Sequence, residues 1–221
     1  MGCRCLRISS LTLRSLGVSD NLYINEGKLE EVIIEDAPLL ERLIPQYICW
    51  GDFVIRVIQA PKLKILGYLS DKFPHLSLEP WFSSLSNVMR TVKILALDTS
   101  LDLEVVIDFL KCFPCVEKLY IVAKQDNFKN VQRYDSIECL DLHLKMVEFI
   151  HYEGNMSDLN FTKFFVVNAR VLQSMKFIVR RDKCDAEWLE KQYQNLQLYA
   201  SATRGITFDF QATYKAGCGD S

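Results

Sequence analysis

One six-position apolar pattern, L-x-x-L-x-L with any aliphatic or aromatic residue in its apolar places, recurs along the whole chain. The full copies begin at Leu13, Leu29, Leu63, Val92, Val116, Ile137 and Leu172, and partial copies stand at Leu40/Leu43 and Leu6/Ile8. The steps between full copies vary from 16 to 35 residues, so the repeat is irregular. A short unit of this kind cannot bury its apolar face alone, and neighbouring units must therefore stack on one another.

The stretch Asp102–Val122 shows one unit at its clearest. From Leu103 to Leu110 the apolar residues stand at i, i+3, i+4 and i+7, which is the spacing of one face of an α-helix. Pro114 lacks a backbone N–H and disfavours helix in the residue before it, so we expect the helix to end near Cys112. The pattern copy from Val116 to Ile121 then predicts a β-strand.

Proline marks the entry to several of the expected strands. Pro38, Pro61 and Pro114 each stand two residues before an apolar strand start. A proline at this place breaks no hydrogen bond of the strand ladder. Three prolines in phase with the apolar pattern support the reading of the pattern as strands.

The second half of the chain alternates strands with longer helices. Ser157 is predicted to cap a helix that carries Phe161, Phe164 and Phe165 on one side. Asp185 is predicted to cap another helix. That helix has Leu189, Tyr193, Leu196 and Ala200 at i, i+4, i+7 and i+11. A short strand at 206–210 closes the series, and we expect a disordered tail over 212–221.

These patterns predict an α/β leucine-rich-repeat solenoid with strands on the concave side and helices or loops on the convex side. The fourth and sixth pattern positions of each strand turn inward, and the positions between them form an exposed concave sheet. Its mixed polarity suits a protein partner better than a small substrate. The predicted partner-binding residues are Glu31, Ile33, Glu35, Ile65, Leu69, Lys118, Tyr120, Val122, Asp141, His143, Lys176 and Ile178.

Composition excludes several classes of function. The net charge is -2 and no basic stripe is present, so neither nucleic acid nor an acidic membrane surface is expected as a partner. No apolar run approaches the ~18 residues of a transmembrane span, and the first residues lack the apolar core of a signal peptide. The eight cysteines are scattered, and we interpret them as free thiols in the cytoplasm or the nucleus.

Catalytic and metal chemistry find little support in the residues. Cys112 and Cys115 have metal or redox spacing, but no second CxxC or nearby histidine pair completes a zinc site. Cys112 also falls at the C-terminal end of its expected helix, where the helix dipole disfavours a thiolate. Asp141 and His143 share a strand face in this reading, but no nucleophile turn accompanies them. No glycine-rich phosphate loop is present either. We therefore expect no catalytic residue, metal or cofactor.

Three segments resemble a known family. The run 106–121 resembles the leucine-rich repeats of plant F-box proteins, particularly those of grasses. The runs 135–147 and 160–177, with 188–192 and 208–210, resemble the FBD domain that continues those repeats at the C-terminal side. The resemblance implies a leucine-rich-repeat region over 1–130, truncated at its N-terminal side, and an FBD-like region over 131–211.

Full-length members of this family resemble substrate receptors of SCF ubiquitin ligases, in which an N-terminal F-box docks on a Skp-type adaptor. The resemblance thus implies a non-catalytic protein-recognition module with an unknown protein substrate. No F-box precedes the repeats here, so adaptor binding is expected only if one lies upstream. Alternatives are a free-standing repeat scaffold or truncated remnant without a ubiquitin role, and an enzyme built on Cys112/Cys115 or Asp141/His143.

Overall fold

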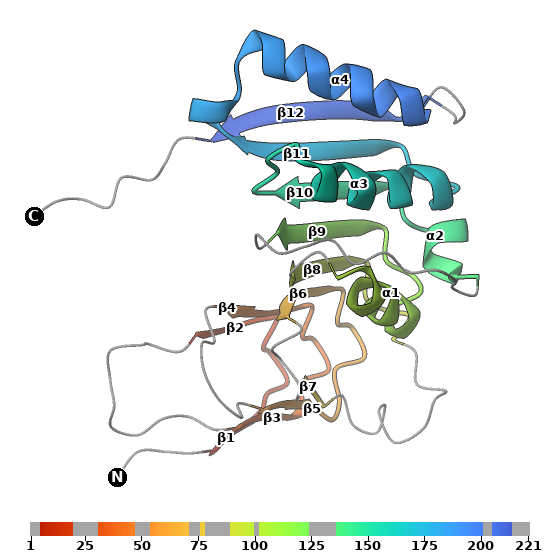
Figure 1. Cartoon of the computed structure of the whole chain (residues 1–221). Helices are drawn as coiled ribbons and strands as arrows, with labels where there is room; N and C mark the ends of the chain where they lie inside the picture. The colour runs from red at the N-terminus through yellow and green to blue at the C-terminus, as the bar shows by residue number, and fades with distance from the viewer. Residues whose placement is uncertain are drawn as a thin grey trace, which may run out of the picture.

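The computed structural model describes residues 5–19, 31–46, 54–70, 76–77, 89–99, 102–123, 136–200 and 205–213. Within these ranges the chain forms two parallel sheets and a set of helices that follow one another along a stack (Figure 1). Each strand is hydrogen-bonded to the strand of the next unit, which is the arrangement of a leucine-rich-repeat solenoid. The predicted fold class is confirmed.

The larger sheet has eight parallel strands in the order β12-β11-β10-β9-β8-β6-β4-β2. Its strands are β2 (Ser15–Ser19), β4 (Arg42–Gln46), β6 (Ile65–Ser70), β8 (Ile94–Thr99), β9 (Lys118–Ala123), β10 (Met146–Ile150), β11 (Ser174–Arg180) and β12 (Thr207–Thr213). The pattern copies that begin at Leu13, Leu63, Val92, Val116 and Leu172 all enter strands of this sheet. β12 runs to Thr213, two residues into the segment expected to be a disordered tail, and the rest of that segment lies outside the described residues.

Before β8, the described residues between the strands of the larger sheet form further strands. β1 (Cys5–Ser9), β3 (Glu31–Asp36), β5 (Val54–Val57) and β7 (Leu76–Ser77) form a separate parallel sheet in the order β1-β3-β5-β7. Figure 1 shows these strands apart from β2, β4 and β6 at the N-terminal end of the stack. The pattern copies at Leu6 and Leu29 therefore form strands of this second sheet. The expectation that Glu31, Ile33 and Glu35 share one concave sheet with the other predicted residues is wrong, because they lie on β3 in this second sheet.

The helix of the central unit forms as predicted. α1 (Leu103–Cys112) begins where Asp102 Oδ1 accepts the backbone N–H of Glu104 at 3.0 Å. It buries its predicted apolar stripe and ends at Phe113, whose N–H donates to the carbonyl of Phe109. Proline follows at once, and β9 begins four residues later. A capped start, a matched stripe and a proline stop thus all agree in one segment.

The pattern copy at 137–142 is not a strand. These residues form the short helix α2 (Glu138–Leu142), because apolar residues three apart also share one face of a helix. Ile137, Cys139 and Leu140 are buried, whereas Leu142 is 61% exposed. The strand of this unit is β10, reached through Leu144, Val147 and Phe149, which have the same spacing.

The two longer helices lie beside the last strands. α3 (Met156–Asn168) starts at Asn155, whose side chain accepts the N–H of Asp158 at 2.9 Å, so the cap is not the predicted Ser157. After the 3-10 turn η1 (Arg181–Lys183), α4 (Ala186–Ala200) begins beside Asp185, whose carboxylate accepts the N–H of Trp188 as predicted. The buried face of α4 carries Gln192 and Leu196, with Trp188 half-buried. The predicted Tyr193 is 36% exposed.

The core is one continuous layer between the larger sheet and the elements that cover its inner face. In the C-terminal part it is built mainly of aromatic rings. Phe149 makes edge contacts with Tyr152 and Phe161, and Phe177 stacks on Phe210 with centroids 4.7 Å apart. Each buried aromatic ring removes a large apolar area from water and so contributes strongly to the packing of this part.

Candidate functional site: the open face of the eight-stranded sheet

Side chains of the larger sheet alternate between a buried and a partly exposed face. On β9, β10 and β11 the residues Leu119, Ile121, Val147, Phe149, Met175 and Phe177 are fully buried in the core that the helices complete. The residues between them are at least partly exposed. No helix of the described residues covers their side, and we call it the open face. The open face on β8 to β11 comprises Ile94, Ala96, Asp98, Lys118, Tyr120, Val122, Met146, Glu148, Ile150, Ser174, Lys176 and Ile178.

Strand register sorts the open face into rows that run across the sheet. Ile150 pairs with Val122 on one side and with Ile178 on the other. All three side chains are partly exposed, so they form an apolar row that reaches solvent. Asp98 continues the row on β8 and Gln211 continues it on β12. An aliphatic row with polar ends resembles the central part of a protein interface, where apolar groups are ringed by polar ones.

The adjacent row is polar. It runs from Ala96 through Tyr120, Glu148 and Lys176 to Asp209. Lys176 Nζ lies 3.6 Å from Glu148 Oε2. Burial raises the pKa of the Tyr120 hydroxyl, and the negative charge of Glu148 raises it further. Tyr120 therefore stays a neutral donor beside a carboxylate, which suits hydrogen bonding to a partner and not proton transfer.

Six of the predicted binding residues belong to the larger sheet and point away from its buried face. Ile65, Lys118, Tyr120, Val122, Lys176 and Ile178 are all partly or fully exposed there. Five of the six lie on β9 and β11, the two strands that pair with β10 on either side. Whether they bind a partner remains a prediction.

Four other predicted residues do not lie on this face. Leu69 is 1% exposed and belongs to the core, because the register shifts between Leu66 and Leu69 and leaves Tyr68 outside. Glu31, Ile33 and Glu35 lie on β3 in the other sheet. There Glu31 pairs with Arg56 and Glu35 with Arg7, each at 2.8 Å, while Ile33 is 6% exposed. The six-position pattern identifies strands but does not say which sheet they join.

Asp141 and His143 lie in or directly after helix α2 and not on a strand. Asp141 pairs with Arg170 at 3.0 Å and accepts from the hydroxyl of Ser136 at 2.6 Å. His143 Nε2 lies 3.9 Å from Glu138 Oε1. The structure therefore gives the two residues separate partners, and it does not support an aspartate–histidine pair.

The sequence prediction missed the centre of the open face. The sequence pattern does not identify Met146, Glu148 and Ile150, because it places the strand of that unit at Ile137. The copy that begins at Leu144 has the same spacing and would have identified them. Asp98 on β8 was also missed, although its strand was predicted.

The cysteines of the described residues are free thiols. Cys112 is the last residue of α1, and burial raises the pKa of its thiol. Burial also raises the pKa of the Cys139 thiol, to about 12. Both shifts disfavour the thiolate that nucleophilic or redox chemistry requires.

Two family models match the chain. The leucine-rich repeats of the FBD-associated F-box protein At5g56370 match residues 1–121, and the FBD model matches residues 134–177. Neither a curated protein nor a solved structure matches. The helices of the described residues include none with the length and apolar character needed to span a membrane.

Proposed function

The chain belongs to the family of leucine-rich repeats found in FBD-associated F-box proteins, and from this premise we propose that it recognises a protein partner through its open face. The observation that carries the proposal is the apolar row Val122–Ile150–Ile178, which is partly exposed and runs across three neighbouring strands of the larger sheet. Aliphatic side chains that face solvent stabilise a protein mainly when another surface covers them and removes them from water.

The chemistry of the face favours a protein over a small substrate. It is broad, mixes apolar and charged groups, and has acidic and basic residues side by side at Glu148 and Lys176. Such a surface gives a partner an apolar centre and a charged rim, whereas catalysis needs convergent polar groups. The module is therefore non-catalytic in this proposal.

The family suggests the larger assembly. We propose that the chain corresponds to the substrate-recognition part of an F-box receptor of a ubiquitin ligase, working in the cytoplasm or the nucleus. One family model matches a leucine-rich-repeat region and the other matches an FBD region. We assign substrate binding to these two regions. Contact with a Skp-type adaptor would require an F-box outside these 221 residues.

Photo-crosslinking from defined positions tests which side binds. A crosslinking amino acid is introduced at Tyr120 or Lys176 on the open face, or at Lys163 or Val167 on the exposed side of α3. The chain is expressed in cells of its source, and crosslinked proteins are identified by mass spectrometry. We expect one specific protein from both open-face positions and not from α3. Crosslinks from α3 alone would overturn the proposal.

The half-life of that partner separates a ubiquitin-ligase receptor from a scaffold. A receptor predicts a longer half-life of the partner when the gene of the full protein is disrupted, and the same lengthening when the proteasome is inhibited. A partner that binds the open face but keeps its half-life would support the scaffold and reject the ligase role.

A further inference from the structure

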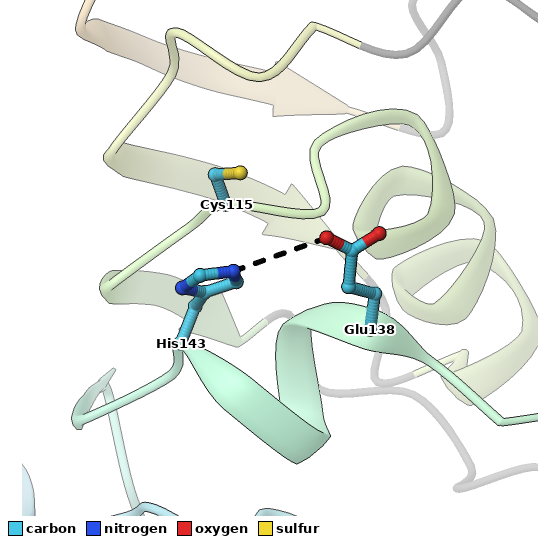
Figure 2. A group of neighbouring side chains, drawn as sticks. All are labelled: Cys115, Glu138 and His143. Carbon is cyan, nitrogen blue, oxygen red and sulfur yellow. Dashed lines mark ion pairs between the residues drawn. The ribbon is translucent and has the colours of Figure 1, made fainter.

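Three side chains of types that can ligate a metal ion come from two successive units. They lie together at the edge of the sheet where the strands begin. Cys115 comes from the turn before β9, and Glu138 and His143 come from the two ends of α2. Their ligand atoms all lie within 4.8 Å of one another. Figure 2 shows the sulfur, the imidazole ring and the carboxylate around one shared space. We propose that Cys115, Glu138 and His143 bind a Zn²⁺ ion.

The framework around these side chains is firm. Cys115 is 8% exposed and is followed by Val116, which is fully buried. At the other side, the backbone N–H groups of His143 and Leu144 both donate to the carbonyl of Cys139, at 3.0 and 2.9 Å. The thiol is thus fixed by core packing, whereas Glu138 and His143 are more than 30% exposed at their side chains and can adjust.

The donor set matches zinc chemistry. Thiolate, imidazole and carboxylate are the three side-chain ligands that zinc takes in proteins, with a water or another group in the fourth position. A sulfur and an imidazole nitrogen select against magnesium and calcium, which prefer oxygen ligands. Tetrahedral zinc with bonds of about 2.0–2.3 Å needs its donors closer than they are now, by up to ~1 Å. Rotation of the two exposed side chains supplies such a movement.

Arg90 is the group that opposes the ion. Its guanidinium donates to both carboxylate oxygens of Glu138, at 2.6 and 3.0 Å, and lies 3.9 Å from the sulfur of Cys115. Binding transfers the thiol proton of Cys115 to solvent, forms the zinc–sulfur bond and breaks the guanidinium contact at the ligating oxygen. Arg90 therefore competes with the ion, and its removal is expected to tighten binding.

Bound zinc would join the unit of β9 to the unit of β10 at the edge of the sheet where these strands begin. Ions that bind the folded chain in preference to the unfolded chain raise its melting temperature. The proposal is independent of the partner that the open face binds, because it concerns a different edge of the sheet. A failure of either proposal leaves the other untouched.

Cobalt titration of the purified full chain tests the site. Co²⁺ bound to a thiolate gives a near-ultraviolet charge-transfer band, and Zn²⁺ then displaces it. We expect one ion per chain, a band that Zn²⁺ removes, and a higher melting temperature with Zn²⁺. Cys115→Ser should abolish the band, and His143→Gln should weaken Zn²⁺ binding more than about tenfold.

Matched controls make the result specific. Cys184→Ser removes a free, half-buried thiol elsewhere, and His151→Asn removes an exposed histidine whose positive φ asparagine tolerates. Both should bind as wild type, and Arg90→Gln should bind several-fold more tightly. If Cys115→Ser fails to fold, the surface substitution His143→Gln decides. Absence of a saturable band in the wild type, or wild-type affinity in His143→Gln, would overturn the proposal.

Discussion

The hydroxyl of Tyr152 donates to Oε1 of Gln192 across 3.0 Å, and both side chains are almost fully buried. The bond joins the segment after β10 to the middle of α4, 40 residues later. Tyr152→Phe keeps the ring but leaves the buried amide oxygen without this donor. We expect a loss of about 1–3 kcal/mol in the free energy of unfolding, measured by urea denaturation. An unchanged midpoint would show that water replaces the hydroxyl at no cost.

Gly154 lies beside the same pair and has a positive φ of 73°. An added Cβ would meet Nε2 of Gln192 at 2.6 Å. Gly154→Ala should therefore add a steric penalty to the ~1–3 kcal/mol of backbone strain. Gly205→Ala is the matched control, because Gly205 has a φ of 67° and no atom within 4 Å of the added Cβ. The difference between the two unfolding free energies isolates the contact with Gln192. Equal losses in both variants would mean that the amide moves aside freely.

Asp158 provides a pH-dependent contribution to stability. It is 2% exposed, and Oδ2 accepts the backbone N–H groups of Glu153 and Gly154 at 2.8 and 2.9 Å. Burial raises the pKa of its carboxyl above the ordinary 3.8, and the backbone hydrogen bonds only partly offset this. The folded state then holds the proton more tightly than the unfolded state. The contribution to stability is fully present below pH 3.8 and is lost as pH rises through the folded-state pKa.

Asp158→Asn tests this sign, because the amide oxygen keeps both acceptor contacts without the charge. The wild type should lose stability relative to Asp158→Asn as pH rises from 4 to 7, followed by thermal melts in paired buffers. Asp158→Ala should cost about 1–3 kcal/mol at any pH, since two backbone donors lose their partner. A wild type that instead gains stability relative to the asparagine variant over this range would contradict the burial effect.

The alternation on β10 predicts opposite outcomes for adjacent residues. Phe149 is fully buried against Tyr152 and Phe161, so Phe149→Ala should cost about 3–5 kcal/mol. Glu148→Ala, one residue earlier on the open face, removes one partly exposed ion pair and should cost less than ~1 kcal/mol. Urea denaturation of both variants checks the assignment. Similar losses would mean that the open face is structural core.

How far the sequence predicts this structure depends on how local the signals are. Over 102–123 the cap at Asp102, the helical stripe and Pro114 agree, and the predicted helix and strand are observed. At 137–142 the strand prediction fails because Ile137 and Leu140, three apart, satisfy a helix as well as the pattern. In such a short segment the competition is decided by tertiary packing and not by propensity.

Sheet membership and the zinc cluster depend on long-range contacts, which periodicity does not encode. Glu31 and Lys118 both follow strand patterns, yet β3 and β9 belong to different sheets. Arg90, Cys115 and Glu138 are brought together only by the stacking of successive units. The Cys112–Cys115 spacing is typical of a paired-cysteine motif, whereas Glu138 and His143, which lie beside Cys115, come from the next unit.

Recognition through the open face is tested most directly by the affinity of the crosslinked partner for three purified chains. These are the wild type, Ile150→Glu and Val167→Glu. Ile150→Glu places a charge in the apolar row of the open face, and Val167→Glu makes the same change at a 56% exposed site on α3. Calorimetric titration should show binding weakened more than about tenfold by Ile150→Glu. The Kd of Val167→Glu should stay within about twofold of wild type, as expected for a substitution outside the interface. Wild-type affinity in Ile150→Glu, or an equal loss in both variants, would contradict recognition through the open face.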